Sequence, residues 1–370
     1  MSGIQVESGV TDKSYPEVFD ERAMLPQPSE KKPGQLPDHL IRQYFEQGYL
    51  VIPKFFTKEE LEPCLKTTEE LVDKFAKKLF EAGKIKSLYE ELGLFKRLIK
   101  LEEDFPGANV ILHKVPNMPM GYRKLWANER LLNLIEQIIG PDIAGSPVWN
   151  LRTKTPQNEA TTVPWHQDNA YLDNQSYNML VPTAWIPLLD ANVDNGCLQM
   201  AEGGHRSGHT AKHQCCWGGT WYVQLDEEEM KTKLGVNPEK DIKSCPVPFG
   251  GMVLFNNLTP HRSLPNVSND IRWSLDLRWQ RASDPDGLWG LKKPVVMRTK
   301  DNPNLEIDWT DFDAVDRHSQ QKKSVEEDLD NTEDPDFDTT LPGPWMKKWE
   351  IIHMNKHVER YKRDEERSSA

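Results

Sequence analysis

The sequence predicts a mainly β fold, an antiparallel barrel or sandwich, with helices packed on its outside. From Ile143 to about residue 281 the apolar runs are short, and Gly, Pro, Asn and Asp interrupt them. Such runs are typical of strands in antiparallel barrels and sandwiches, and they are SPVWNLRT, VPWHQD, PTAWIPLLD, GCLQMA, MVLFNN and IRWSLDLRW. Before residue 140, apolar residues instead recur at helical spacing. Among these architectures we expect a cupin-like double-stranded β-helix, or jelly roll, with the N-terminal helices outside the barrel.

Local signals predict where the N-terminal helices begin and end. The run DHLIRQYFEQ is amphipathic and stops at Gly48, as a short helix would. Thr57 followed by Glu60 is a capping-box signature, so a long helix is expected after it. The segment 87–103 is predicted to continue helically, and Asn128 is the expected N-cap of a further helix.

Composition along the chain predicts three regions. Residues 1–36 are rich in Pro, Ser and charge and have no apolar period, so a poorly structured tail is expected. Residues 37–300 are expected to form the jelly-roll domain with its helices. Residues 301–370 are an acidic C-terminal extension, in which VEEDLDNTEDPDFDTT is expected to be solvated. A packing helix is expected after it, with its apolar side formed by Trp345, Trp349, Ile352 and Met354.

The composition also excludes some classes of protein. The formal net charge is -12 at pH 7, whereas a nucleic-acid-binding surface is basic. No apolar stretch has the length of a membrane span, and the N-terminus lacks a signal-peptide core. The chain ends in Ser-Ser-Ala, unlike a peroxisomal SKL-type signal. We therefore expect a cytoplasmic protein that binds neither nucleic acid nor membrane, with its five cysteines reduced. No feature predicts the oligomeric state.

Three residues are candidate ligands of one metal ion. His166 and Asp168 are two positions apart, so on an extended strand both side chains lie on one face and Gln167 points away. His261 is the third candidate, far off along the chain. Two imidazoles and one carboxylate with open positions form the facial triad of non-haem Fe(II) oxygenases. Taken singly, each residue would more often be a hydrogen-bonded loop residue, and Zn(II) could occupy the same ligands.

An arginine downstream of His261 is a candidate anion-binding residue. Arg272 lies eleven residues after His261, within the alternating run IRWSLDLRW, and Ser274 shares its strand face. A guanidinium can bind a carboxylate through two parallel hydrogen bonds. Ser263, two residues after His261, could add a hydroxyl near the metal. The alternative for Arg272 is an ion pair at a sheet edge.

These motifs together resemble the phytanoyl-CoA dioxygenase family, from roughly Leu40 to Gln280. The matching pieces are His166-Gln167-Asp168, Asn195-Gly196-Cys197-Leu198, Gly204-His205 with Ser207-Gly208, and His261-Arg262-Ser263 followed by Arg272. The order of the pieces is more specific than any one of them. The run Ala201 to His205 departs from the family's Pro-Gly-Ser-His, and because that loop borders the site mouth in relatives, the resemblance does not predict the substrate.

The resemblance implies an Fe(II)- and 2-oxoglutarate-dependent dioxygenase that hydroxylates a small organic molecule and releases succinate and CO2. It implies iron on the triad, 2-oxoglutarate and O2 as co-substrates, and ascorbate as a reductant. Family members also contact 2-oxoglutarate with a lysine from a strand before the barrel and with a tryptophan. Lys114 in VILHK and Trp185 in TAWIP stand at the matching places, although core packing is the alternative for Trp185.

Other functions remain open from the sequence alone. The same iron site could perform desaturation or cyclisation, because those outcomes depend on substrate placement. A non-catalytic jelly-roll binding protein and a zinc hydrolase are further alternatives. The carboxylate at Asp168 argues against a halogenase, in which Gly or Ala replaces that ligand. His205, His209 and His213 recur every fourth residue, but the glycines among them favour a loop over a helical zinc site.

Overall fold

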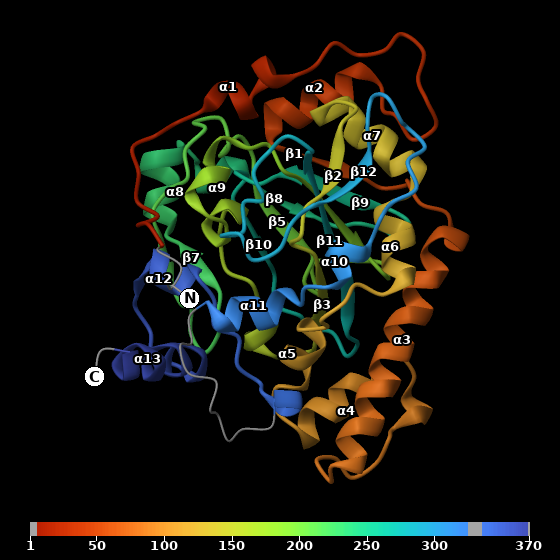
Figure 1. The fold of residues 1–370 in the computed structure, drawn as a ribbon, viewed down its shortest axis with the longest axis vertical. Coiled ribbons are helices and arrows are strands. Elements are labelled where there is room, and N and C mark those ends of the chain that lie inside the picture. The colour runs from red at the N-terminus through yellow and green to blue at the C-terminus, as the bar shows by residue number, and fades with distance from the viewer. Residues whose placement is uncertain (1–5, 325–334, 369–370) are drawn as a thin grey trace.

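A central β structure lies among helices that cover its upper, right and lower sides in the view of Figure 1. The computed structural model describes residues 6–324 and 335–368. The N-terminal half contributes most of the covering helices, which are α1 (Pro16–Phe19), α2 (Asp38–Gln47), α3 (Lys58–Glu81), α4 (Arg97–Asp104), α5 (Ala108–His113), α6 (Met120–Trp126) and α7 (Glu129–Ile139).

The capping signals in the sequence set the helix boundaries. Thr57 and Glu60 form the full capping box at the start of α3. The side chain of Asn128 accepts a hydrogen bond from the backbone N–H of Leu131 at the start of α7. Helix α2 ends at Gly48, whose φ of 87° is in the left-handed region that favours glycine. These predicted boundaries are confirmed.

The largest sheet has seven strands, all paired antiparallel, in the order β1-β9-β4-β11-β2-β12 with β3 also beside β11. The strands are β1 (Tyr49–Ile52), β2 (Ile143–Gly145), β3 (Asn150–Lys154), β4 (Pro182–Pro187), β9 (Met252–Asn256), β11 (Arg272–Arg281) and β12 (Val295–Arg298). The long strand β11 runs through the middle of this sheet, so its side chains reach both faces.

One face of the large sheet packs against helices. The odd-numbered residues of β11 point to this face, and Trp273, Leu275, Leu277 and Trp279 are fully buried there. The same apolar cluster contains residues of α3, α6 and α7. Burial of this much apolar surface is the main favourable term in folding, so this layer anchors β11 rigidly.

The other face of the large sheet faces a three-stranded antiparallel sheet, β10-β5-β8. Its strands are β5 (Leu198–Ala201), β8 (Ile242–Cys245) and β10 (His261–Ser263). One apolar cluster joins Trp185 and Phe255 of the large sheet to Leu198 and Met200 of β5. Two antiparallel sheets that face each other across such a core, with helices outside, match the predicted jelly-roll class, and that prediction is confirmed.

Both ends of the described chain pack onto this body. Figure 1 shows the red N-terminal segment crossing the top of the molecule and descending beside α8 (Glu227–Leu234) toward α12 (Trp345–Lys348). Phe19 is fully buried in the main core, and the N–H of Tyr15 donates to the carbonyl of Gly208. Residues 6–36 therefore lie along the surface of the domain, with Phe19 as the apolar anchor of this polar segment.

The C-terminal extension wraps across the front of the small sheets as α10 (Thr310–Asp313), α11 (Arg317–Lys323), α12 and α13 (Lys356–Ser368). Strand β13 (Glu350–Ile351) adds to a third sheet with β6 (His213–Cys215) and β7 (Val223–Leu225). Trp345 and Trp349 are buried, whereas Ile352 and Met354 are exposed. The segment expected to hold a packing helix forms α12, β13 and α13, and Val358 and Tyr361 of α13 are buried in an apolar cluster. Most of the expected acidic stretch lies outside the described residues.

Three further predictions differ from the structure. The segment 87–103 is not one helix, because Gly93 with φ of 64° separates a 3-10 turn from α4. The run VILHK, expected as a strand, forms the end of α5. Cys215 and Cys216 are joined in a disulfide, so only Cys64, Cys197 and Cys245 are free thiols. None of the described helices has the length and apolar character needed to cross a membrane.

Candidate functional site

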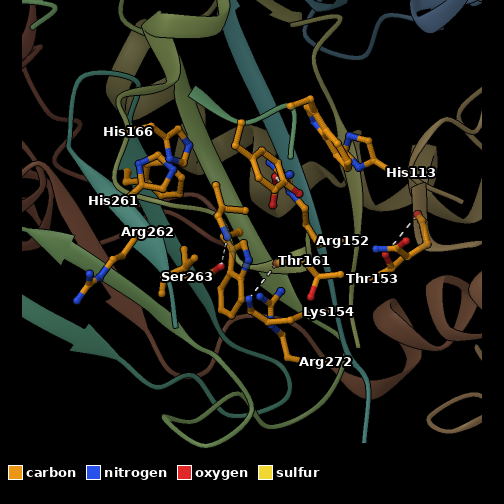
Figure 2. A pocket seen from close by; sticks show the side chains of 18 of the residues that line it. His113, Arg152, Thr153, Lys154, Thr161, His166, His261, Arg262, Ser263 and Arg272 are labelled. Carbon is orange, nitrogen blue, oxygen red and sulfur yellow. Dashed lines mark hydrogen bonds and ion pairs between the residues drawn. The ribbon is translucent and has the colours of Figure 1, made fainter. Parts of the chain in front are cut away.

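His166 and His261 are brought together by backbone pairing. The N–H of each residue donates to the carbonyl of the other, at 3.0 and 2.9 Å. Residues that exchange both hydrogen bonds in an antiparallel pair place their side chains on the same face. The two ring centroids are accordingly 4.2 Å apart, and Figure 2 shows both rings at one end of the cavity.

A second hydrogen bond orients each imidazole ring. The Nδ1 atoms of His166 and His261 lie 2.9 Å from the carbonyl oxygens of Pro164 and Thr259. A carbonyl can only accept, so each Nδ1 carries a proton, and in the neutral ring the lone pair is then on Nε2. Burial, followed by the neighbouring His166, lowers the pKa of His261 to about 3, which keeps this ring neutral. Neutral imidazoles with free Nε2 atoms are the state that binds a metal ion.

Asp168 completes the group. Its Oδ1 lies 3.6 Å from Nε2 of His166 and 3.8 Å from Nε2 of His261. Its Oδ2 accepts from Nε and Nη2 of Arg278, each at 2.9 Å, and from the hydroxyl of Thr183 at 3.3 Å. Burial raises the pKa of this carboxyl, but the Arg278 guanidinium beside it outweighs burial and holds the pKa well below its usual range. The carboxylate is therefore ionised, with one oxygen anchored and the other directed at the imidazoles.

These three residues fit a transition-metal ion. One ligand atom from each lies within 4.8 Å of the others, and among the described residues this is the one such group of His, Cys, Asp and Glu. The set offers two neutral nitrogens and one anionic oxygen, which is the donor set of the non-haem Fe(II) facial triad. The arrangement predicted from the sequence, including the extended conformation of Gln167, is therefore present.

Gln167 and His213 hold the backbone that carries the first two ligands. The buried amide of Gln167 bonds to the carbonyls of His209 and Leu258 and to the N–H of Ala211. Nε2 of His213 accepts from the N–H of Gln167 at 3.0 Å. The histidines after the ligand motif thus do not form a metal site. Gln167 and His213 tie the ligand segment to the neighbouring loops, whereas Nε2 of His205 bonds to the carbonyl of Phe45.

The C-terminal extension holds the turn immediately after Asp168. The amine of Lys348 donates to the carbonyls of Asn169 and Leu172, and the indole N–H of Trp349 donates to the carbonyl of Ala170. All of these donors are buried. Because the C-terminal extension binds three of the four carbonyls of residues 169–172, the turn has little freedom to move Asp168 away from the imidazoles.

A polar face of the large sheet forms the floor of the site. On β11 the even-numbered residues Arg272, Ser274, Asp276 and Arg278 point away from the helices and toward the small sheet. The first three stand directly opposite Lys154, Arg152 and Asn150 of β3. Nε of Arg152 donates to Asp276 at 2.7 Å. A strand that appears half polar in sequence is therefore buried on both faces, with its polar side lining a cavity.

Two cations in this floor have no carboxylate partner. Arg272 is only 2% exposed; its Nη1 donates to Ser274 and its Nη2 to the carbonyl of Gly196, while its Nε has no partner. Lys154 is 1% exposed and donates to the carbonyl of Thr161 and the hydroxyl of Thr162. No carboxylate of a described residue lies within ion-pairing distance of either group. Buried cations are costly unless an anion compensates them, so this pair is suited to an anionic ligand.

A first cavity connects these cations to the imidazoles. His166, His261, Lys154 and Arg272 all line it, and Figure 2 shows Lys154 and Arg272 together at the end away from the two rings. Trp185 also lines it, with the Arg272 guanidinium 5.1 Å from its ring centroid. The Ser263 hydroxyl accepts from the N–H of Val163 and lies on the same wall. The structure thus brings Arg272, Ser263 and Trp185 to one cavity with two of the candidate ligands.

Lys114 does not lie in this cavity. Its amine donates to the carbonyls of Asp338 and Thr340 in the C-terminal extension. The reason is that VILHK is helical, so Lys114 follows α5 on the outside of the sheets. The lysine beside Arg272 is Lys154, which ends β3 and pairs directly with Arg272. The sequence signal for it was the strand-like run SPVWNLRT, which the next residue extends.

A second cavity lies on the other side of the ligands. Asp168 and Tyr171 line it, together with Arg317 of α11 and Trp345 of α12. Arg152, His113, Trp221, Tyr222 and Arg278 border both cavities. The triad therefore stands between two adjoining spaces, one closed by Arg272 and Lys154 and the other by the C-terminal extension. Sequence reasoning missed Arg278 and Arg317, which carry no motif.

The comparison with protein families identifies this architecture. A family model described as phytanoyl-CoA dioxygenase (PhyH) matches residues 44–274, which is more than half of the chain. This chain belongs to the PhyH family. The resemblance inferred from the sequence motifs is therefore confirmed, and all three candidate metal ligands and Arg272 lie within the matched range.

Curated relatives of this PhyH-family chain include two kinds of enzyme. A 1-deoxypentalenic acid 11-beta-hydroxylase from Streptomyces exfoliatus is 28% identical over 183 residues, which cover 45% of this chain and 59% of the relative. A phytanoyl-CoA dioxygenase from Arabidopsis thaliana is 23% identical over 293 residues, covering 70% of this chain and 98% of the relative. The chain thus spans about three fifths of the length of the first of these relatives.

Solved structures support the fold of this PhyH-family chain. A crystal structure of EctD from S. alaskensis with 2-oxoglutarate and 5-hydroxyectoine superimposes with a TM-score of 0.52 at 16% identity, covering 80% of this chain and 97% of that chain. At this identity the similarity concerns the fold alone. It agrees with the arrangement of two facing sheets and outer helices described above.

Proposed function

We propose that this protein is an Fe(II)- and 2-oxoglutarate-dependent dioxygenase that hydroxylates a small organic molecule. The observation that carries the proposal is the joint presence of two sites in adjoining walls. One is a buried His-Asp-His group with its free ligand atoms converging. The other is a pair of buried cations, Arg272 and Lys154, that lack a carboxylate. A dicarboxylate co-substrate bound near a metal ion requires both.

His166, Asp168 and His261 would hold the iron in this proposal. Bound Fe(II) supplies the activation of O2 that couples oxidative decarboxylation of 2-oxoglutarate to insertion of one oxygen atom into a C–H bond. The balance is that one O2 and one 2-oxoglutarate are consumed while one succinate, one CO2 and one hydroxylated product are formed. Arg278 keeps one oxygen of Asp168 occupied, so the other oxygen stays directed toward the metal.

Arg272 and Lys154 would bind the distal carboxylate of 2-oxoglutarate, with Ser263 and Trp185 along the same wall. The free Nε of Arg272 can donate to it, and the amine of Lys154 can turn from Thr162 toward it. The carboxylate would then neutralise two buried positive charges at once. Burial of all three candidate ligands, each no more than 6% exposed, would keep water from the reacting centre.

Release of labelled CO2 tests this proposal. The purified protein is incubated with Fe(II), ascorbate, O2 and 2-oxoglutarate labelled at C1, first alone and then with a panel of small molecules. We expect iron-dependent CO2 release that stops under nitrogen, and no release from His261→Ala. Mass analysis of the product distinguishes hydroxylation, which adds one oxygen, from desaturation or cyclisation, which removes two hydrogens.

The controls separate the alternatives. Zn(II) in place of Fe(II) should abolish CO2 release, because zinc has no redox chemistry. A zinc hydrolase would instead be active without O2. If no CO2 is released by the iron-loaded protein with any member of the panel, the proposal is wrong and a binding protein is favoured.

A further inference from the structure

The second cavity contains a buried guanidinium that no described residue neutralises. Arg317 is 4% exposed, at the start of α11. Its Nη1 donates to the carbonyl of Pro147 at 3.3 Å, its Nη2 to Oδ1 of Asn150 at 3.2 Å, and its Nε has no partner. The other two guanidiniums at this cavity are paired, Arg152 with Asp276 and Arg278 with Asp168.

The residue beside Arg317, His318, accepts one hydrogen bond of the guanidinium. Nη2 of Arg317 lies 3.0 Å from Nε2 of His318. A guanidinium can only donate, so Nε2 is the acceptor and the proton of the neutral ring is on Nδ1. Burial and the adjacent Arg317 hold the pKa of His318 well below its usual value, which agrees with a neutral ring. The side chain of Gln321, on the same helix, is a hydrogen-bond partner of His318.

The wall formed by α11 thus presents a charged donor that lacks a partner. Arg317 lines the second cavity, and its Nε is buried without a hydrogen bond. Buried polar groups in proteins are almost always bonded, and buried cations are costly unless an anion compensates them. The free Nε therefore indicates that a ligand supplies an acceptor, and the charge on Arg317 favours an anionic one.

The rest of the cavity is mainly apolar and aromatic. Tyr171, Trp221, Leu288, Leu341 and Trp345 contribute to its lining. Asp168 also lines it, so a ligand that fills this space lies next to the candidate metal ion. A molecule with one anionic end and an apolar body would place the charge at α11 and the body toward Asp168.

We propose that the second cavity binds an apolar substrate through its carboxylate group, with Arg317 as the pairing residue. This rests on the proposed function, because it identifies the second cavity as the place of the molecule to be oxidised. Arg317 is the one guanidinium at this cavity without a carboxylate partner among the described residues. Its single positive charge matches the single negative charge of a carboxylate and not the two charges of a dianionic phosphate. The substrate-binding wall is then supplied by the C-terminal extension and not by the sheets.

Calorimetric titration of matched probes tests the proposal without turnover. The full chain is loaded with Mn(II) and 2-oxoglutarate under nitrogen, and it is titrated with decanoate, cyclohexylacetate and 1-naphthylacetate, each beside its primary amide. The amides have almost the same shape but no charge. We expect at least one acid to bind about thirtyfold or more tightly than its amide. This factor is the lower end of the range expected when one partner of a buried charge pair is lost.

Variants assign the preference to Arg317. Arg317→Met should reduce the ratio of amide to acid dissociation constants to about one and leave amide binding nearly unchanged, which also shows that the cavity is still formed. Arg317→Lys should restore part of the ratio. The control is Lys323→Met, which removes a positive charge from the exposed side of the same helix, and it should keep the wild-type ratio.

The outcomes separate this inference from the proposed function. If no acid binds more tightly than its amide, or if Arg317→Met keeps the preference, the assignment of Arg317 is overturned. The same samples loaded with Fe(II) and O2 report CO2 release independently. Preference for acids without CO2 release would contradict the oxygenase and leave the carboxylate site in place, whereas CO2 release without that preference would contradict only the carboxylate site.

Discussion

Replacing Arg272 by methionine should weaken 2-oxoglutarate binding strongly. Arg272 is 2% exposed, it has a free Nε, and no described carboxylate pairs with it. Loss of one partner of a buried, hydrogen-bonded charge pair costs about 2–5 kcal/mol. Lys154 remains beside the carboxylate in this variant, so we expect the lower part of that range. A loss of about 2–3 kcal/mol corresponds to a dissociation constant raised about thirtyfold to about 150-fold.

The measurement is calorimetric titration of 2-oxoglutarate into protein loaded with Mn(II) under nitrogen. Arg262→Met is the matched control. Arg262 borders the same cavity, but its guanidinium donates to Gln199 and lies over the Trp165 ring, and Figure 2 shows it directed away from Lys154 and Arg272. The control should change the affinity by no more than about threefold, as expected for a group outside the binding contact. A similarly small change in Arg272→Met, with Mn(II) still bound, would refute the role assigned to Arg272.

The affinity for 2-oxoglutarate should also depend on pH through Lys154. Burial, followed by Arg272, lowers the pKa of this amine well below its usual value, and a bound carboxylate would raise it again. At a pH above this lowered pKa, Lys154 therefore takes up a proton when 2-oxoglutarate binds. The affinity should fall as the pH rises from the pKa of Lys154 in the free protein toward its pKa in the complex. Titrations in buffers of different ionisation enthalpy measure the proton uptake, and Lys154→Met should remove it. Replacing Arg278 by methionine frees Oδ2 of Asp168 and should weaken metal binding about tenfold to a hundredfold. Competition with a chelator measures this loss. Arg298→Met, which removes a buried guanidinium that bonds to Glu136 and Asn133 on α7, should leave the metal affinity unchanged, and equal losses in both variants would contradict the role of Arg278.

The metal ligands could be predicted from the sequence because their chemistry is local. His166 and Asp168 are separated by one residue, and the period of an extended strand alone places them on one face. His261 was identified by the motif around it, and its backbone pairing with His166 explains why so distant a residue meets the first two. Arg272 was found from its spacing to His261 and its alternating strand.

Lys154 shows where this reasoning fails. A buried strand and a buried helix cannot be distinguished by a short apolar run, and VILH adopts a helix because it packs between α4 and β3. Once that segment is helical, Lys114 leaves the cavity and Lys154 takes the place beside Arg272. Tertiary packing, which no local pattern records, decided between the two lysines.

Arg278 and Arg317 were missed for a different reason. Polar residues that alternate along a strand usually face water, so Arg278 in RWSLDLRW gave no sign of an internal role. Only the small sheet on that side of β11 makes the polar face internal. Arg317 follows the N-cap Asp316 of α11, but no motif in this segment links it to the barrel. Its position depends on how the C-terminal extension crosses the second cavity.

The hydrogen bonds from Lys348 and Trp349 to the turn after Asp168 have a consequence for how the protein matures. The amine of Lys348 holds the carbonyl of Asn169, a residue made 179 positions earlier. During translation, the acidic ligand leaves the ribosome long before the side chains that restrain its turn exist. A nascent chain that includes His261 can pair its two histidine segments, but the hydrogen bonds that restrain the turn after Asp168 cannot yet form. The centre can therefore become rigid only after the C-terminal extension has been made and has folded back onto the turn.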